Sequence, residues 1–344
     1  MDYLVINSKI KMKPSIICLT PVRNEAWILD RFLKAASLWA DYIIIADQMS
    51  TDGSRQIAMN YPKVMLIDNN SESFNEPERQ KLLIKEARKI KGPRLLITLD
   101  ADEMFTPNVF NSDEWNLMLQ AKPGTIFKFQ WANIRPDFKT MWLSEFLHWG
   151  YMDDGYENKY INKIHSARIP LPSGHVEVSI ADVKLMHFQY TDWERMKSKQ
   201  RWYQCLETIN DPQKSALDLF RQYHHMDSIP QNEIISIPKE WFQEYKVFGI
   251  DLTERNLETK NWFDVEVLNM IEKFGKNLFK KLMIWDINWV NIAKLYNKEL
   301  LNQFKDPRNI SDKSIQKWMM KTQNKLDKLR YRRIDRLIKY IFNY

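Results

Sequence analysis

Short apolar segments alternate with segments of helical periodicity through the first two hundred residues of the chain. The apolar segments contain many β-branched residues, as buried strands do. They are residues 15–20, 42–46, 64–67 and 95–99. Apolar residues recur at helical spacing between them, in 27–38 and again in 74–90. Strands that alternate with helices predict a parallel sheet covered on both faces.

Acidic residues follow two of these predicted strands. Asp47 comes directly after 42–46, and Asp100 and Asp102 come directly after 95–99. Ligands of such sheets gather at the carboxyl ends of the strands, so we expect the three carboxylates to converge on one crevice. Two carboxylates one residue apart suit Mg²⁺ or Mn²⁺, which prefer oxygen ligands. An acidic pair of this kind can also simply cap a helix or stay solvated.

Three ordered sequence segments carry a family resemblance. They are T-P-V-R-N-E at 20–25, I-A-D-Q-M-S-T-D-G-S at 45–54 and L-I-T-L-D-A-D-E at 96–103. Together they resemble the nucleotide-sugar signatures of family 2 glycosyltransferases, including bacterial transferases of lipopolysaccharide cores and surface glycans. The resemblance covers roughly residues 14 to 205. It implies the α/β GT-A fold, whose Rossmann-like sheet binds a nucleoside diphosphate sugar and a divalent metal, here Mn²⁺ or Mg²⁺.

The first two segments imply contacts to the nucleotide base. By resemblance, Thr20, Pro21 and Glu25 flank the base, and Asp47 hydrogen-bonds uracil or its equivalent. Many family members have a second acidic residue after this position, where this chain has Gln48. The presence of a nucleotide is therefore better supported than the identity of its base, for which we expect uracil.

The third segment implies contacts to the ribose and the metal. By resemblance, Asp100 and Ala101 lie near the ribose, and Asp102 ligates the metal beneath the diphosphate. His187 ends the last predicted strand, and is either a further ligand of the metal or diphosphate or a structural hydrogen bonder. Arg79 resembles a family arginine that pairs with the diphosphate or holds Asp100, but it can also be a surface arginine.

The catalytic base is the least determined residue of the predicted site. An inverting transferase needs a carboxylate or imidazole to take the proton from the acceptor hydroxyl. We expect Glu177 in this role, with Asp153 and Asp154 as alternatives in an aromatic-rich segment suited to a sugar site. The competing interpretations are that Glu177 pairs with His175 or a lysine on a sheet edge, and that the two aspartates form a solvated turn.

These expectations describe a transferase that moves one sugar, with inversion, from a nucleoside diphosphate donor to a hydroxyl of a lipid-linked or surface glycan. One alternative is a sugar nucleotidyltransferase on the same fold. Such enzymes usually carry a Gly-rich loop after the first strand, whereas residues 21–25 contain no glycine. Another alternative is a catalytically inactive glycan- or membrane-binding module that has kept the fold.

The sequence predicts three regions. They are a GT-A domain at 14–225, a helical tryptophan-rich extension at 230–305, and one or two basic amphipathic helices at 311–344. Several apolar residues of the middle region have the spacing of core positions in a helix. These are Val267, Leu268, Ile271, Phe274, Leu278 and Leu282.

Positive charge gathers at the C-terminal end of the sequence. Residues 313–344 hold ten basic and two acidic residues, a net of +8, while the whole chain has a net charge of +7. An approximate helical stripe of apolar residues runs through this segment, and a basic amphipathic helix is typical of a membrane-surface binder. Alternatively, the stripe packs on the preceding helices. We expect no nucleic-acid partner, because a phosphate backbone offers the stripe no apolar surface.

The remaining composition bears on location. Two cysteines in 344 residues offer no disulfide framework, and the polar start shows no signal peptide. We therefore expect a cytoplasmic protein, with peripheral attachment at the inner face of the membrane.

Overall fold

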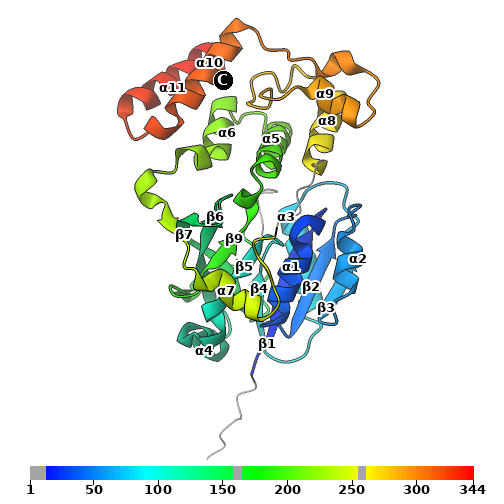
Figure 1. Cartoon of the computed structure of the whole chain (residues 1–344), viewed down its shortest axis with the longest axis vertical. Helices are drawn as coiled ribbons and strands as arrows, with labels where there is room; N and C mark the ends of the chain where they lie inside the picture. Colours follow the sequence, from blue (N-terminus) through cyan, green and yellow to red (C-terminus); the bar gives the residue numbers. More distant parts are fainter. Residues whose placement is uncertain (1–12, 158–164, 255–260) are drawn as a thin grey trace, which may run out of the picture. The chain divides into compact units, whose positions relative to one another are not determined.

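The computed structural model describes residues 13–157, 165–254 and 261–344, and the chain divides into two compact units (Figure 1). The first unit contains the described residues up to Gln189 and the segment from Ser236 to Glu254. The second contains Tyr190–Ile235 and the described residues from Asn261 onward. The division thus differs from the ranges 14–225, 230–305 and 311–344 expected from the sequence.

The first unit is built around one mixed sheet with the strand order β3-β2-β1-β4-β7-β6-β9-β5 and with β8 beside β6. The strands β1 to β4 are parallel, and β7 runs antiparallel to β4. The bounds are β1 Ser15–Val22, β2 Tyr42–Asp47, β3 Val64–Asp68, β4 Arg94–Thr98, β5 Glu103–Phe105, β6 Ile126–Ile134, β7 Thr140–Met152, β8 Glu177–Ser179 and β9 Leu185–His187. The α/β class predicted from the alternating pattern is confirmed, although the sheet is mixed and only β1 to β4 have the parallel, Rossmann-like arrangement that the resemblance implies.

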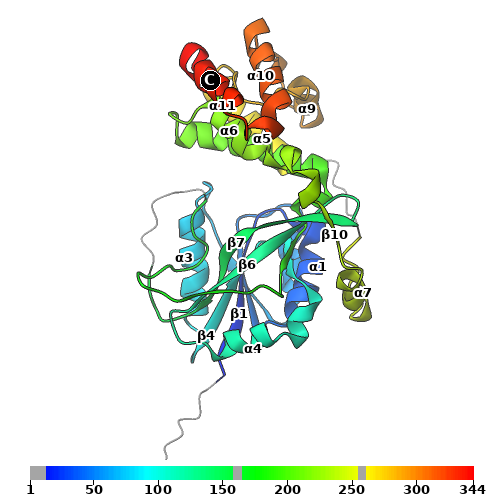
Figure 2. The same cartoon turned by 90° about the vertical axis from the view of Figure 1, so that its left-hand side faces the viewer.

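Helices cover both faces of this sheet, with α1 and α3 on opposite sides (Figure 2). The alternation along β1 explains the two cores: Cys18 packs in the core that contains α1, whereas Ile17 and Leu19 pack in the core that contains α3. Asn75 caps α3, since its side chain accepts a hydrogen bond from the backbone N–H of Glu78. The helices of this unit are α1 Ala26–Ser37, α2 Ser54–Met59, α3 Glu76–Ala87, α4 Asp113–Gln120 and α7 Glu240–Val247.

The second unit is helical. Its helices are α5 Trp193–Asn210, α6 Ala216–Tyr223, α8 Trp262–Phe274, α9 Trp289–Leu295, α10 Ile310–Thr322 and α11 Leu329–Phe342, and the two-residue strand β10 Ile235–Ser236 lies where the chain passes between the units. Four of the six expected core positions between 267 and 282 are buried, but Phe274 and Leu278 are exposed. The helix ends at Phe274, and Gly275 follows with a φ of 80°, so the helical spacing does not continue to Leu278.

The C-terminal segment forms two α-helices rather than one. The α-helical backbone of α10 ends at Thr322, and α11 begins at Leu329 after a short 3₁₀ turn. Among the helices that the structure describes, none combines the length and the apolar character needed to cross a membrane.

Candidate active site

The carboxyl ends of β1, β2 and β4 form one edge of the sheet. Val22 of β1 lies opposite Asp47 of β2, and Leu19 lies opposite Thr98 of β4. Because β2 and β4 lie on either side of β1, Asp47 is two strand spacings, about 10 Å, across the sheet from the segment that contains Asp100. The predicted convergence of these acidic segments on one edge follows from the register.

Two loops at this edge are tied to each other by hydrogen bonds. The backbone N–H of Asn24 donates to Ser50 Oγ at 2.9 Å, and the backbone N–H of Thr51 donates back to Asn24 Oδ1 at 2.8 Å. Asn24 has a φ of 55°, a conformation that asparagine tolerates. The backbone N–H of Glu25 donates to Ser54 Oγ at 2.8 Å. Pro21 lies within β1, and the loop that follows this strand, which contains Glu25, is thereby fixed against the loop after β2.

Asp47 is buried at the end of β2 with one oxygen unused. Its side chain is 3% exposed, and Oδ2 lies 3.4 Å from Arg55 Nη1. The other oxygen, Oδ1, is buried and has no hydrogen-bond partner among the described residues. Such an acceptor is costly to bury unless a donor reaches it. Asp47 can therefore accept a hydrogen bond from a ligand.

Gln48, the departure from the family pattern, has a structural role. Its Nε2 donates to the backbone oxygen of Ser71 at 2.8 Å and to that of Ser73 at 3.1 Å. A carboxylate has no hydrogen to donate to these carbonyls. The amide therefore holds the loop after β3 against the end of β2 in a way that an acidic residue would not.

Arg168 holds two carboxylates of the third motif. Its Nη2 donates to Asp100 Oδ2 at 2.6 Å, and its Nη1 donates to Glu103 Oε2 at 2.7 Å and Oε1 at 3.0 Å. Burial lowers the pKa of the Arg168 guanidinium, but Asp100 and Glu103 outweigh burial and raise it above its ordinary value. This arginine fills the position-holding role that the sequence suggested for Arg79.

Glu103 is fully buried, and both of its oxygens accept hydrogen bonds. Besides Arg168, the backbone N–H of Asp100 donates to Oε2 and Trp131 Nε1 donates to Oε1, each at 3.0 Å. Burial raises the pKa of Glu103 to about 7, with Arg168 opposing the rise and Asp100 and Asp102 adding to it. Glu103 therefore organises the surrounding residues rather than facing a ligand.

His187 lies directly beside the acidic motif, because β9 pairs with β5 and sets His187 opposite Glu103. The Nδ1–H of His187 donates to Asn133 Oδ1 at 2.8 Å, which leaves the lone pair of Nε2 facing Asp102 Oδ2, 3.9 Å away. The ring of Trp131 stacks on the imidazole, with centroids 4.5 Å apart. A ring N–H held by an acceptor, with the second nitrogen turned toward a carboxylate, is typical of a histidine that ligates a metal.

Asp102, Glu103 and His187 form a group whose ligand atoms lie within 4.8 Å of one another, so the group could hold a metal ion. We call these three residues the metal-competent group. Because Glu103 is engaged by Arg168 and Trp131, Asp102 and His187 are the better ligands. A divalent cation would also offset the excess of carboxylates around Arg168. The side chains present thus fit a metal ion, although they do not identify the element.

Two of the three expected base candidates lie at the opposite end of β4. Asp153 pairs with Arg88 at 2.9 Å and Arg94 at 2.8 Å, and its backbone N–H donates to the carbonyl of Arg94, the first residue of β4. Asp154 accepts hydrogen bonds from the hydroxyl of Tyr151 and the backbone N–H of Tyr156. Because Asp100 follows the last residue of β4, the structure does not bring either aspartate to the metal-competent group.

Glu177 also lies away from this group. Glu177 is opposite Ile126 on β6, whereas His187 is opposite Asn133. Glu177 and His187 are therefore seven residues, or about 23 Å, apart along β6. The Glu177 carboxylate contacts Lys128 Nζ at 2.6 Å and the Nε2 atoms of His175 at 2.8 Å and His148 at 3.0 Å.

These contacts explain the charge state of the Glu177 carboxyl. Hydrogen bonds from Lys128, then His175 and His148, lower the pKa of Glu177 to about 2. The structure therefore agrees with the competing interpretation, in which Glu177 pairs with His175 and a lysine on the sheet.

Of the remaining expected residues, Thr20 is buried in β1, and Ala101 is buried between Asp100 and Asp102. The guanidinium of Arg79 lies 3.8 Å from Glu76 and 4.8 Å from the ring centroid of Phe74. No contact to Asp100 is recorded for it in the described part of the chain.

The sequence did not indicate Glu103, Trp131, Asn133 and Arg168 as members of the site. Arg168 belongs to a segment without a recognisable motif, and Asn133 sits inside a strand. Only Glu103 was within a motif, and its position directly after Asp102 is the one signal that could have included it.

Comparison with known proteins gives only distant similarities. No protein-family model matches the chain, and no curated protein matches it in sequence. Among solved structures, it is similar to HddC from Yersinia pseudotuberculosis, with a TM-score of 0.30 and 12% identity over 52% of this chain and 94% of that one. It is also similar to S. aureus TarS 1-349, with a TM-score of 0.28 and 14% identity over 81% of this chain and 78% of that one. At these TM-scores neither similarity bears on function.

Proposed function

We propose that this protein is a metal-dependent glycosyltransferase that uses a nucleoside diphosphate sugar, with UDP as the nucleotide. The observation that carries the proposal is the joint placement of two unlike features on one sheet edge. One is the unused buried oxygen of Asp47, and the other is the metal-competent group that contains Asp102 and His187. A nucleoside diphosphate presents a base with N–H donors and a diphosphate that binds divalent cations, so it matches both features.

Each side chain then has a defined task. Asp47 accepts a hydrogen bond from the base, between the loops that Asn24 ties together. Asp100, fixed by Arg168, accepts hydrogen bonds from the ribose hydroxyls. Asp102 and His187 would hold Mn²⁺ or Mg²⁺, which supplies charge neutralisation for the leaving diphosphate.

The acceptor side of the proposal rests on the sequence resemblance. We propose a hydroxyl of a lipid-linked or surface glycan as acceptor, inversion at the transferred sugar, and action at the cytoplasmic side of the membrane. The proposal assigns none of Glu177, Asp153 and Asp154 as the proton acceptor.

The test is hydrolysis of a panel of nucleotide sugars by the full chain. The quantity measured is the free nucleoside diphosphate that is released. Water can replace an unknown acceptor, so the donor half is tested alone. We expect turnover of at least one UDP-sugar, loss of turnover in excess chelator, and recovery on addition of Mn²⁺ or Mg²⁺. Undiminished turnover in chelator would overturn the metal dependence.

Two further arms separate the alternatives. A nucleotidyltransferase would release pyrophosphate from a nucleoside triphosphate and a sugar 1-phosphate, and would leave the nucleotide sugars intact in water. An inactive module would bind nucleotide sugars without turnover of any of them. Either result would replace the transferase proposal.

A further inference from the structure

The last helix, α11, has two unlike faces. On one face Asp335 and Ile338 are buried against the rest of the second unit, and Tyr344, just beyond the helix, is also buried. The remaining surface of the helix, which we call its outer face, is largely exposed and contains both apolar and basic residues. The expectation that the apolar stripe packs on preceding helices is therefore correct for only one side of the helix.

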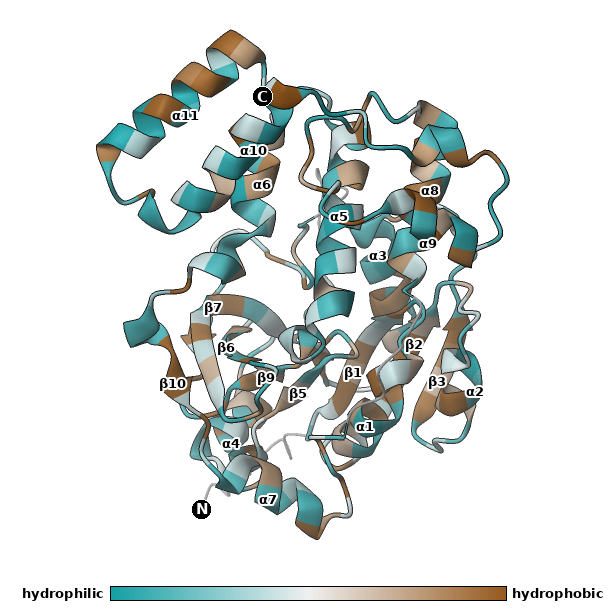
Figure 3. Cartoon of the chain, turned by 45° about the horizontal axis from the view of Figure 1, so that its top comes forward, coloured by the Kyte–Doolittle hydropathy of each residue, from teal (hydrophilic) through white to brown (hydrophobic). Residues whose placement is uncertain are grey.

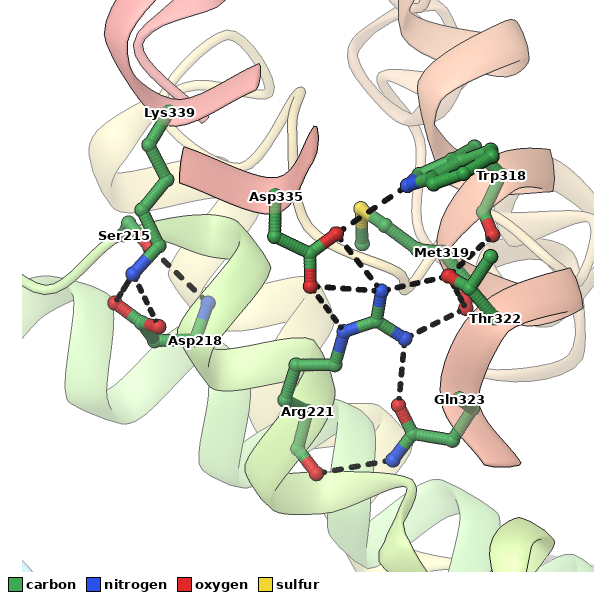
Figure 4. A network of polar contacts seen from close by, with 9 residues as sticks. All are labelled: Ser215, Asp218, Arg221, Trp318, Met319, Thr322, Gln323, Asp335 and Lys339. Atoms are coloured by element: carbon green, nitrogen blue, oxygen red, sulfur yellow. Dashed lines mark hydrogen bonds and ion pairs between the residues drawn. The ribbon is translucent and has the colours of Figure 1, made fainter. Parts of the chain in front are cut away.

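A polar network fixes the inner face (Figure 4). The guanidinium of Arg221, on α6, donates to both oxygens of Asp335 at 3.0 and 3.1 Å and to Thr322 Oγ1 at 2.8 Å. Trp318 Nε1 donates to Asp335 at 3.2 Å, and Lys339 pairs with Asp218. Because these bonds set the rotation of α11 about its axis, the residues of its outer face are held outward.

The outer face carries an apolar stripe, which we define as Ile334, Leu337 and Ile341. These residues follow the spacing i, i+3, i+7, so they share one side of the helix. Their exposed fractions are 36%, 55% and 63%. Hydrophobic residues recur along α11 in Figure 3, and Tyr340, 89% exposed, adds an aromatic ring beyond the stripe.

The charges on this outer face are of one sign. Arg330, Arg332, Arg333 and Arg336 are exposed on α11. The helix has one acidic residue, Asp335, which faces inward and is paired with Arg221. On α10, Lys313, Lys317 and Lys321 follow at intervals of four residues and are exposed as well. The outer surface of α11 therefore combines unpartnered apolar side chains with unopposed positive charge.

We propose that the outer face of α11 binds an anionic membrane surface. The apolar stripe would enter the boundary between headgroups and acyl chains, while Arg330 and Arg333, each four residues before a member of the stripe, contact lipid phosphates. Charge complementarity selects this partner, since a neutral bilayer leaves the arginines unused and a nucleic acid leaves the stripe exposed to water. The proposal does not depend on the catalytic function, because it concerns residues of the second unit alone.

The experiment is sedimentation of the full chain with vesicles of phosphatidylcholine alone or with about 30% phosphatidylglycerol. Removal of the helix would also remove the buried network, so substitutions on the outer face are preferable. Leu337→Asp/Ile341→Asp removes the stripe, and Leu300→Asp/Val247→Asp adds the same charge at two exposed apolar positions elsewhere. Arg330→Gln/Arg333→Gln removes the charge beside the stripe, and Lys122→Gln/Lys305→Gln is its matched control.

We expect the wild type to bind the anionic vesicles and not the neutral ones, with weaker binding as salt increases. Both α11 variants should lower the partition coefficient by about tenfold or more, whereas both control variants should stay near the wild type. Circular dichroism should show unchanged thermal unfolding for all four variants, since every substituted residue is exposed.

Three results would overturn the proposal. The first is equal binding of the wild type and the stripe variant to anionic vesicles. The second is an equal loss of binding in the α11 variants and in their controls. The third is the absence of vesicle binding together with salt-dependent binding of duplex DNA or RNA that the arginine variant abolishes, which would assign the face to nucleic acid.

Discussion

In the proposed function, Asp102 is the carboxylate that would hold the metal at the strand ends, because Arg168 engages Asp100 and Glu103 instead. We expect Asp102→Asn to reduce nucleotide-sugar turnover below detection, since one ligand charge is lost, while the unfolding temperature stays close to that of the wild type. Turnover by Asp113→Asn, an exposed acidic residue at the start of α4, serves as the control. Full activity of Asp102→Asn would remove Asp102 from the mechanism.

Arg168 offsets the repulsion among the carboxylates of Asp100, Asp102 and Glu103. Its loss in Arg168→Gln leaves the buried Glu103 without its cation, which should cost about 3–5 kcal/mol of unfolding free energy. In Arg168→Gln/Glu103→Gln the buried charge is gone as well, so the double variant should be more stable than the sum of the single effects predicts. Urea denaturation of the four proteins measures this coupling. Strictly additive losses would show that the pair does not interact.

At the scale of elements, the loop after β3 depends on the end of β2. Gln48 donates to two carbonyls of that loop. Replacement by an acidic residue, Gln48→Glu, should therefore destabilise the protein by about 1–3 kcal/mol, because the two carbonyls lose their donor and face a carboxylate. Gln56→Glu on the exposed side of α2 makes the same chemical change without these contacts. Equal denaturation midpoints for both variants would refute this account of the loop.

Asp153 joins the segment after α3 to the start of β4. Burial raises the pKa of Asp153, but hydrogen bonds from Arg88, the backbone N–H of Gly155 and Arg94 hold it below its ordinary value. The carboxylate therefore stabilises the fold above the unfolded pKa of about 3.9, and this stabilisation disappears as the pH falls through the lower folded pKa. We expect Asp153→Asn to lose about 3 kcal/mol near neutral pH and to differ less from the wild type at about pH 3.

Urea denaturation at both pH values tests this prediction, with donor hydrolysis at neutral pH as a second readout. A structural Asp153 leaves hydrolysis by the folded variant within a few-fold of the wild type. An equal stability difference at both pH values would show that the carboxylate charge does not contribute.

Much of this edge was predictable because it depends on local pattern. A β-branched run followed by an acidic residue places Asp47 and Asp100 at strand ends, and the topology of parallel strands brings those ends together. His187 was predictable for the same reason. Arg168 was not, since its partners lie 65 and 68 residues away and depend on the path of a loop without a motif.

The position of Glu177 along the sheet was not predictable for a related reason. Glu177 and His187 both belong to strands beside β6, but only the register shows that they lie seven residues apart along it. The apolar stripe of α11 was visible as a helical pattern. Which part of that pattern packs inward depends on Arg221 and Asp335, which are 114 residues apart in the chain.

For the whole molecule, the candidate active site and the basic surface belong to different units. The metal-competent group and Asp47 belong to the first unit, whereas the basic outer face of α11 belongs to the second. Residues 313–344 have a net charge of +8 and the whole chain has a net charge of +7, so the residues before 313 are close to neutral. Substitutions in one unit should therefore leave the function of the other intact.

The central claim is that a nucleoside diphosphate and a divalent cation bind together at the ends of β1, β2 and β4. Calorimetric titration of UDP into the full chain, with Mn²⁺ and again in excess chelator, tests it most directly. We expect Mn²⁺ to strengthen binding by about tenfold or more in the wild type and to have no effect in Asp102→Asn. Asp47→Ala should lose about 1.5–3 kcal/mol in either condition and keep the effect of Mn²⁺. Equal affinity of the wild type for UDP with Mn²⁺ and with chelator, or no binding in either, would contradict the account.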